Sequence, residues 1–265
     1  MKAIISKPTI TLVISVVLSW IKPQIAFALS GSGRDRVTVE TNQKKYKTST
    51  ISTVYLGGED KEIRIFVPEN SAGKFLKDST RKIESTVDNR CPSDFALSQL
   101  IAHCPNLVNE RNVLELSSGL GMVSAVACKY SRPNHVAITD HDKSLLALAY
   151  ASCVELQRSK ASVSRCHMDW SEPSTWPQQK YDMVLAANVL NDKQNIVPLV
   201  NVIQYYLCND DKCGTRKQAV IVDPINQINR HLFCYAARRA GLEVDQKEFP
   251  GSPDLMLFNI SPTIE

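Results

Sequence analysis

Short apolar runs alternate with longer amphipathic segments from about residue 92 to the C-terminus. Buried strands are typically unbroken apolar runs of four to eight residues, whereas helices repeat apolar residues at spacings of three and four. The predicted strands span residues 112–116, 135–139, 161–166, 181–187, 218–223, 242–249 and 254–260. The predicted helices span residues 92–103, 119–130, 143–156, 196–207 and 226–240. This alternation predicts a doubly wound, mostly parallel seven-stranded sheet with helices on both faces.

The helix boundaries carry recognisable end signals. Ser93 or Asp94 is a candidate cap for the first helix, and Asp142 for the third. Gly241 follows the last helix, where a left-handed residue is favoured.

The last two strands are separated only by residues 250–253, Pro-Gly-Ser-Pro. A parallel crossover needs a dozen or more residues, so the final strand must return antiparallel. The sheet is therefore predicted to end in an antiparallel hairpin.

A second hairpin is predicted at the N-terminal side of the main domain. Residues 51–56 and 62–67 alternate in part between apolar and polar positions, and Gly57-Gly58-Glu59-Asp60 forms a turn between them. Residues 68–89 are polar and irregular, so residues 51–91 are predicted to be a hairpin and loop extension of the domain at 92–265.

Residues 1–28 have the three parts of a secretory signal peptide. Lys2 and Lys7 precede an apolar stretch at residues 10–21, and Ala26-Phe27-Ala28 is a small-x-small cleavage site. The apolar stretch is short for a membrane span, which takes about 20 residues. No stable span is expected after cleavage; an uncleaved anchor is the alternative.

Residues 29–50 are rich in basic, serine and threonine residues and are predicted to be a flexible linker or transit segment. A signal peptide followed by such a stretch resembles the leaders of proteins that enter plastids of secondary origin. The destination is therefore either such a plastid or another compartment of the secretory pathway.

Composition narrows the class of protein. The chain has 265 residues, 43% hydrophobic residues and a formal charge of +4, values typical of a soluble globular protein without a nucleic-acid-binding surface. Its eight cysteines show no Cys-x-x-Cys pair and no metal-ligand spacing, so no metal site is predicted. We expect buried, reduced thiols, with Cys208 and Cys213 as the one pair placed for a local disulfide. The sequence carries no signal of oligomeric state, so we expect a monomer.

The candidate chemistry begins where the first strand of the main sheet ends. Gly119 and Gly121 remove side chains where the backbone must approach a ligand closely. Glu115 lies near the end of that strand, where its carboxylate suits an ammonium group and would repel a pyrophosphate. Open α/β sheets bind ligands at this carboxyl edge.

Two further acidic positions follow the next strands. Asp140 comes about 20 residues after the loop, where a carboxylate accepts hydrogen bonds from ribose hydroxyls. Asp169 is placed to accept a hydrogen bond from the amino group of an adenine, and Trp170 is placed to cover the adenine ring. The alternatives are a helix cap for Asp140 and an ordinary core aromatic for Trp170.

With these residues in place, residues 50–260 resemble the class I, Rossmann-like S-adenosylmethionine-dependent methyltransferases, and within them the methyltransferase-16 protein-lysine methyltransferases. The resemblance rests on Glu115 with the glycine loop, Thr139-Asp140, Asp169-Trp170 and Ala187, and on Asp223-Pro224 after the fifth strand. It implies S-adenosylmethionine as cofactor. The implied cofactor-binding residues are Glu115, Ser117, Ser118, Gly119, Leu120, Gly121, Asp140, His141, Asp169, Trp170 and Ala187.

The sequence departs from the family at several positions. Ser117 replaces the first loop glycine, and Ser124 a glycine that faces the helix. The family's Asp-x-x-Tyr, which faces the acceptor lysine, reads Asn188-Val-Leu-Asn191, and its Trp-Pro ahead of the first helix is Cys91-Pro92. No dedicated catalytic residue is expected, because methyl transfer depends on positioning; Asn188 is the candidate for placing the acceptor.

The resemblance implies N-methylation of a protein side chain, lysine in the family. Three alternatives stay open: methylation of a small molecule, a non-catalytic binding module that keeps the fold, and a dinucleotide-dependent reductase, against which the terminal antiparallel hairpin argues. The altered residues at positions 117, 124 and 188 favour the second of these.

Overall fold

The structure is a computed structural model, and it describes residues 38–41, 49–56, 61–68, 92–208 and 217–263. The predicted leader at 1–28, most of the linker at 29–50, the turn at 57–60 and the loop at 69–91 lie outside the described residues. Within the described part of the chain, no helix is long and apolar enough to cross a membrane.

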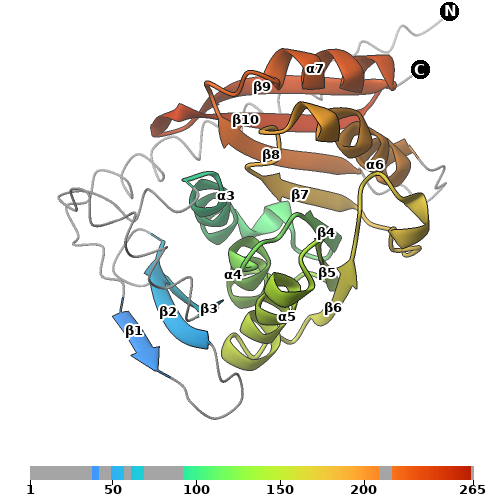
Figure 1. The fold of residues 1–265 in the computed structure, drawn as a ribbon. Coiled ribbons are helices and arrows are strands. Elements are labelled where there is room, and N and C mark those ends of the chain that lie inside the picture. Colours follow the sequence, from blue (N-terminus) through green and yellow to red (C-terminus); the bar gives the residue numbers. More distant parts are fainter. Residues whose placement is uncertain (1–37, 42–48, 57–60, 69–91, 209–216, 264–265) are drawn as a thin grey trace, which may run out of the picture.

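The main domain is built on a seven-stranded sheet in the order β6-β5-β4-β7-β8-β10-β9 (Figure 1). Its strands are β4 (Asn112–Leu116), β5 (His135–Asp140), β6 (Ser162–His167), β7 (Met183–Ala187), β8 (Gln218–Pro224), β9 (Leu242–Phe249) and β10 (Ser252–Pro262). The first five are mutually parallel, and β10 runs antiparallel to both β8 and β9. The predicted sheet and its terminal hairpin are confirmed.

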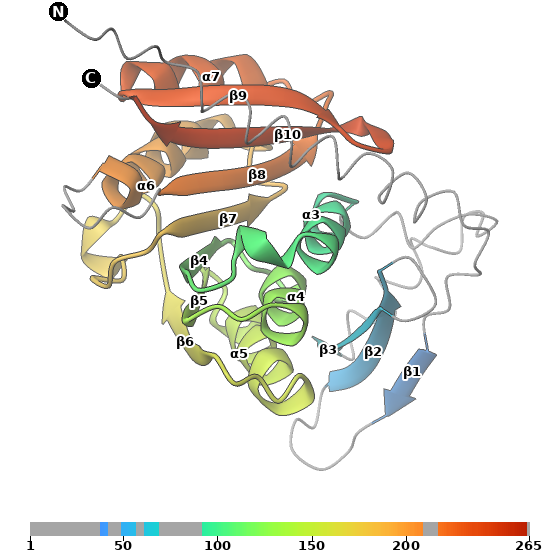
Figure 2. The same ribbon diagram turned by 180° about the vertical axis from the view of Figure 1, so that it is seen from behind.

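Helices cover both faces of this sheet, because successive residues of its central strands point to opposite sides. On one side, Val113 and Val220 pack with α3 (Pro92–His103), α4 (Met122–Tyr130) and α5 (Lys143–Ala151). On the other, Leu114 and Ile221 pack with α6 (Ile196–Cys208) and α7 (Arg230–Arg239). Figure 2 shows the two helical layers from behind.

A smaller antiparallel sheet lies against the layer of α3, α4 and α5 (Figures 1 and 2). It contains β1 (Thr38–Thr41), β2 (Ser49–Tyr55) and β3 (Glu62–Pro68) in that order. Val54 and Ile63 join the same core as α3 and α4, and Lys129 Nζ and Tyr130 Oη in α4 both donate to Glu62 O at 2.6 Å. The predicted hairpin is confirmed.

The prediction of a flexible linker at residues 29–50 is wrong for the part that forms β1 of this sheet. Thr38–Thr41 forms β1 and pairs with residues 50–53 of β2. Thr-Val-Glu-Thr is rich in β-branched residues, which suit an edge strand, although four residues are too few to stand out from a basic, polar segment.

Several helix boundaries differ from the expected ones. Helix α3 starts at Pro92, which suits the first helical position because its φ is already helical and it has no N–H; Ser93 and Asp94 therefore lie inside the first turn and are not caps. Helix α7 starts only at Arg230, after a turn at residues 225–229. Gly241 ends it with φ of 76°, as predicted.

Candidate functional site

The loop between β4 and α4 turns sharply at the carboxyl edge of the sheet. Ser117, Gly119 and Gly121 all adopt left-handed backbone angles, with φ of 53°, 52° and 71°. The Ser118 N–H donates to Thr139 O at 2.9 Å, which joins the loop to the end of β5. Helix α4 begins after these turns, at Met122, so the expected start at residue 119 is three residues early. The left-handed glycines are the reason.

Gly121 and Gly119 are required for different reasons. A Cβ on Gly121 would lie 2.6 Å from the Cβ of Ala149 in α5, closer than side chains approach, and would carry a positive φ as well. A Cβ on Gly119 would meet nothing within 4 Å, so only its φ of +52° disfavours a side chain. Gly121 therefore lets α5 pack against the loop.

Glu115 is buried beneath the loop, and its carboxylate is directed at the start of α4. Glu115 Oε2 accepts hydrogen bonds from Ser124 Oγ and from the Ser124 N–H, the latter at 3.1 Å. Burial raises the pKa of Glu115 to about 8, and the Ser124 hydroxyl partly opposes this rise. The Ser124 hydroxyl thus gives the carboxyl group a hydrogen-bond donor that glycine, with no side chain, could not supply. The ammonium-binding role expected of Glu115 is a prediction that the protein's own contacts leave untested.

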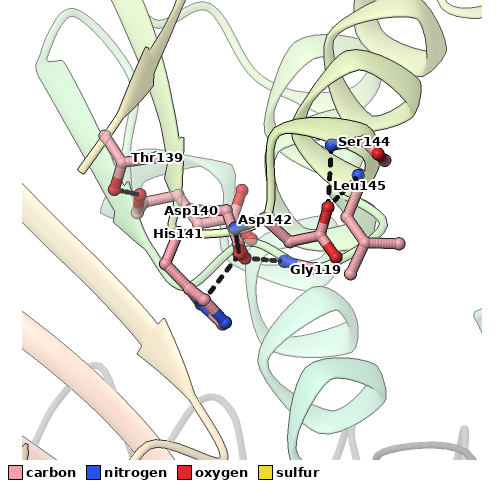
Figure 3. Close-up of polar contacts among 8 residues, drawn as sticks. Gly119, Thr139, Asp140, His141, Asp142, Ser144 and Leu145 are labelled. Atoms are coloured by element: carbon pink, nitrogen blue, oxygen red, sulfur yellow. Dashed lines mark hydrogen bonds and ion pairs between the residues drawn. The ribbon is translucent and has the colours of Figure 1, made fainter. Parts of the chain in front are cut away.

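Asp140 holds the loop from the end of β5 (Figure 3). Its Oδ2 accepts from the Gly119 N–H at 2.8 Å, and its Oδ1 accepts from the Asp142 N–H at 2.9 Å and lies 3.3 Å from His141 Nδ1. A carboxylate oxygen has a second lone pair, so each retains capacity to accept from a ribose hydroxyl.

The helix-capping role belongs to the neighbouring aspartate. Asp142 Oδ1 accepts from the N–H groups of Ser144 and Leu145 at 2.7 and 3.2 Å, at the start of α5 (Figure 3). The cap predicted at Asp142 is confirmed, and the alternative role of Asp140 as that cap is removed.

Asp169 and Trp170 follow β6. The exposed Asp169 carboxylate accepts from the N–H and hydroxyl of Ser171 at 2.8 and 2.6 Å, and these bonds lower its pKa. His141 lies close enough to contribute to the same shift. Trp170 is partly buried against the core on the α6 side. Asp169 thus lies near the His141 side of the site, while its carboxylate forms a local turn.

The loop after β7 begins directly beyond Ala187, which is buried. Asn188 is left-handed with φ of 54°, and its N–H donates to Val222 O at 3.0 Å. The side chain of Asn188 is partly exposed and that of Asn191 exposed, whereas Val189 and Leu190 are buried. The two positions that carry Asp and Tyr in the family are therefore those that face outward.

A buried carboxylate lies beneath this loop. Asp223 lies at the end of β8, and its Oδ2 accepts hydrogen bonds from the N–H groups of Val189 and Leu190 at 2.6 and 3.1 Å. Only its resemblance to a family Asp-Pro was visible in the sequence. A carboxylate ending an otherwise apolar strand was the available signal.

The residues present suit an adenosyl ligand. A glycine loop follows the first central strand, a carboxylate follows the second, and the Ser118 hydroxyl is buried without a hydrogen-bond partner among the described residues. Open α/β sheets bind their ligands at this carboxyl edge, so the site lies where the cofactor of the resembled class I methyltransferases is expected.

Comparisons with known proteins agree with that class. A family model described as lysine methyltransferase matches residues 88–219. No curated protein sequence matches the chain significantly.

Two solved structures share the fold. A methyltransferase from Pyrococcus furiosus is 15% identical, with a TM-score of 0.52, and the alignment covers 74% of this chain and 99% of that one. The CcbJ methyltransferase from Streptomyces caelestis is 12% identical, with a TM-score of 0.52, and the alignment covers 68% of this chain and 94% of that one.

The protein is a class I S-adenosylmethionine-dependent methyltransferase. It resembles the lysine methyltransferases in its sequence from residue 88 to residue 219, and S-adenosylmethionine is its cofactor.

Proposed function

We propose that this methyltransferase N-methylates a protein side chain, with lysine as the acceptor that the family match favours. The observation that carries the proposal is the loop at residues 188–191. Its first and fourth positions, which carry Asp and Tyr in the family, are partly exposed and exposed, and the two positions between them are buried.

S-adenosylmethionine supplies a methyl group on a positively charged sulfur, and that charge disappears as the methyl moves to the acceptor. The protein therefore has mainly to align the two partners and exclude water. Asn188 carries an amide where the family has a carboxylate, so it can donate to or accept from the acceptor group without adding charge.

The experiment is methyl transfer from labelled S-adenosylmethionine onto synthetic peptides whose central residue is Lys, Arg, His, Gln or Asn. We expect labelling of a subset with a nitrogen side chain, led by Lys, and its loss in Asp140→Ala. Labelling that is independent of the central residue would contradict side-chain N-methylation.

A non-catalytic binding module is the second candidate, and specific residues favour it. Ser117 occupies a left-handed position normally suited to glycine, and Asn188 and Asn191 have replaced both polar groups of the acceptor motif. Calorimetry with residues 30–265 separates the candidates: micromolar binding of S-adenosylmethionine, abolished in Asp140→Ala, supports the enzyme, and a folded protein that does not bind supports the module.

A small-molecule acceptor is the third candidate. A small-molecule acceptor predicts a different result from a protein side chain: free amines and hydroxyls would be labelled, while every peptide would stay unlabelled. The small N-terminal sheet favours a protein substrate in our proposal, because small-molecule enzymes commonly carry a helical lid in its place.

We propose further that the chain enters the secretory pathway through residues 1–28 and acts as a monomer on protein, with no nucleic-acid partner. A plastid of secondary origin is the proposed destination, and retention as a membrane anchor by an uncleaved leader is the alternative. A fluorescent fusion of residues 1–55 tests this, since a signal confined to the endoplasmic reticulum would exclude the plastid.

A further inference from the structure

The loop at residues 188–191 is fixed by its backbone. Val189 and Leu190 are 3% and 0% exposed and pack in the core with α6 and α7. From β8, the Val222 carbonyl accepts the Asn188 N–H. From the turn before α7, Asn229 Nδ2 donates to Leu190 O at 2.9 Å.

The central contact of the loop is with a carboxylate. Asn188 is left-handed, and the two N–H groups that follow it converge on the single oxygen Asp223 Oδ2. Successive N–H groups that converge in this way form a concave anion-binding arrangement, which favours an ionised partner over a neutral one. The loop therefore encloses a side chain of its own protein as the anion.

Burying this carboxylate is costly, which makes its presence informative. Asp223 is 0% exposed, and its Oδ1 has no hydrogen-bond partner among the described residues. A buried charge with only part of its hydrogen bonds satisfied lowers stability, and an apolar residue at the end of an apolar strand would avoid that cost. An apolar residue at this position would leave the buried N–H groups of Val189 and Leu190 without this acceptor, so the aspartate matters for how the loop is held.

We propose that Asp223 is a positioning residue for methyl transfer: it folds the 188–191 loop so that the amides of Asn188 and Asn191 face the methyl acceptor. The inference rests on the proposed function for its acceptor, but its geometric part stands on the loop alone. Asp223 acts through the backbone of Val189 and Leu190 and does not itself touch the acceptor.

The hydrogen bonds from the loop to Asp223 can be followed directly through ionisation of its carboxyl group, whereas its acceptor-positioning role is tested by comparing kcat with the cofactor Kd. Burial raises the pKa of the Asp223 carboxyl to about 6, and the two N–H groups oppose that rise. Protonation removes the negative charge from Oδ2, so the amide protons of Val189 and Leu190 must report it.

The first measurement is a pH titration of backbone amide NMR shifts in the wild-type protein, from pH 7.5 to pH 5. We expect the Val189 and Leu190 amide protons to move together with a midpoint near pH 6, and to stay constant in Asp223→Asn. Asp192→Asn is the matched control, because Asp192 caps the next turn by accepting the Gln194 N–H at 2.9 Å. Its Val189 and Leu190 shifts should titrate as in the wild type.

The second measurement is transfer to the best-labelled peptide of the acceptor series at pH 7.5. We expect Asp223→Asn to lower kcat at least tenfold while the Kd for S-adenosylmethionine changes less than threefold, and Asp192→Asn to change neither. A cofactor Kd that rises in parallel with the loss of kcat would overturn the acceptor-positioning role.

The two parts fail separately. Val189 and Leu190 shifts that ignore pH in the wild type would overturn the inference whether or not any peptide is methylated. If those shifts titrate but every peptide stays unlabelled, the proposed function and the acceptor role both fail, and only the folding of the loop by Asp223 remains.

Discussion

Two loops at the carboxyl edge of the sheet differ in what holds them. The loop after β4 is shaped by glycines and by the carboxylates of Glu115 and Asp140 at the ends of β4 and β5. The loop after β7 contains no glycine, and the buried carboxylate of Asp223 collects its N–H groups. The first retains Glu115, Gly119, Gly121 and Asp140 but has serine in place of two family glycines, whereas the second has amides in place of the carboxylate and phenol of the family's acceptor motif.

The cofactor-binding role and the acceptor role proposed for these loops therefore depend on different residues. Each loop contains one non-glycine residue with a φ near 54°, Ser117 at 53° and Asn188 at 54°. Asparagine tolerates the left-handed region well, whereas serine does so less readily. The backbone strain therefore lies in the cofactor loop, and the chemical change lies in the acceptor loop. Substitutions at seven positions, taken in four sets, test this difference.

The largest effect is expected at the tightest contact of the cofactor loop. Gly121→Ala must force Ala149 away and adopt a positive φ, so we expect about 3 kcal/mol of destabilisation and loss of cofactor binding. Gly119→Ala, with open space at its Cβ, should cost only about 1 kcal/mol. Denaturant unfolding compares them, and equal costs would show that crowding by α5 is unimportant.

Cofactor affinity should depend on Asp140 far more than on its neighbour. Asp140→Ala removes the acceptor of the Gly119 N–H, and we expect a loss of about 100-fold in affinity for S-adenosylmethionine, or roughly 2.7 kcal/mol. Asp142→Ala removes only the α5 cap and should cost about 1 kcal/mol of stability with a small change in affinity. Calorimetry gives both affinities; similar losses in the two variants would count against Asp140 as a cofactor residue.

Glu115 should make the cofactor loop sensitive to pH. Folding raises the pKa of Glu115 from its ordinary 4.5 to about 8, so between those values the folded state binds more protons than the unfolded state. Its contribution to stability is then complete below pH 4.5 and is lost as the pH rises through 8.

Glu115→Gln removes this titration while retaining a hydrogen-bond acceptor for Ser124. Between pH 6 and pH 8, we expect the wild type to lose about 2 kcal/mol relative to the variant, since one proton gives about 1.4 kcal/mol per pH unit. Chemical denaturation at each pH measures it. Parallel stability curves for the two proteins would mean that Glu115 stays ionised in the fold.

The smallest effect compares the two left-handed residues. Ser117→Gly relieves an unfavourable φ and should stabilise the protein by up to about 1 kcal/mol, whereas Asn188→Gly should gain only a few tenths, because asparagine already tolerates that region. Differences in thermal midpoint measure both. A larger gain at Asn188 would reverse the assignment of strain to the cofactor loop.

The sequence predicted most of the sheet because its apolar runs are short and separated by clear turns. It missed β1, which has only four residues, and placed the start of α4 too early because left-handed glycines delay that helix. It also placed the start of α7 too early, because residues 225–229 form a turn. Among the candidate site residues, spacing and the family resemblance together pointed to Asp140 and the glycines, and their cofactor-binding roles stay predictions. It did not reveal that Ser124 supplies the partner of Glu115.

The cysteines were also predicted only in part from the sequence. Cys128, Cys153 and Cys234 are free and buried in the apolar cores, as their apolar surroundings predicted. Cys104 and Cys166 are half-buried and Cys208 is exposed, so the expectation of burial was wrong for these three. Cys208 is free in the structure, which contradicts its suggested disulfide with Cys213.

The sequence by itself determined the class of fold, the antiparallel ending and the cofactor edge, because each follows from local periodicity, loop length or residue spacing. Only the tertiary structure decided which buried groups face one another. Asp223 lies more than thirty residues from Val189 and Leu190 along the chain, and β8 brings it beneath their loop only because β7 and β8 are neighbours in the sheet. Its role depends on that pairing, which no local pattern in the chain records.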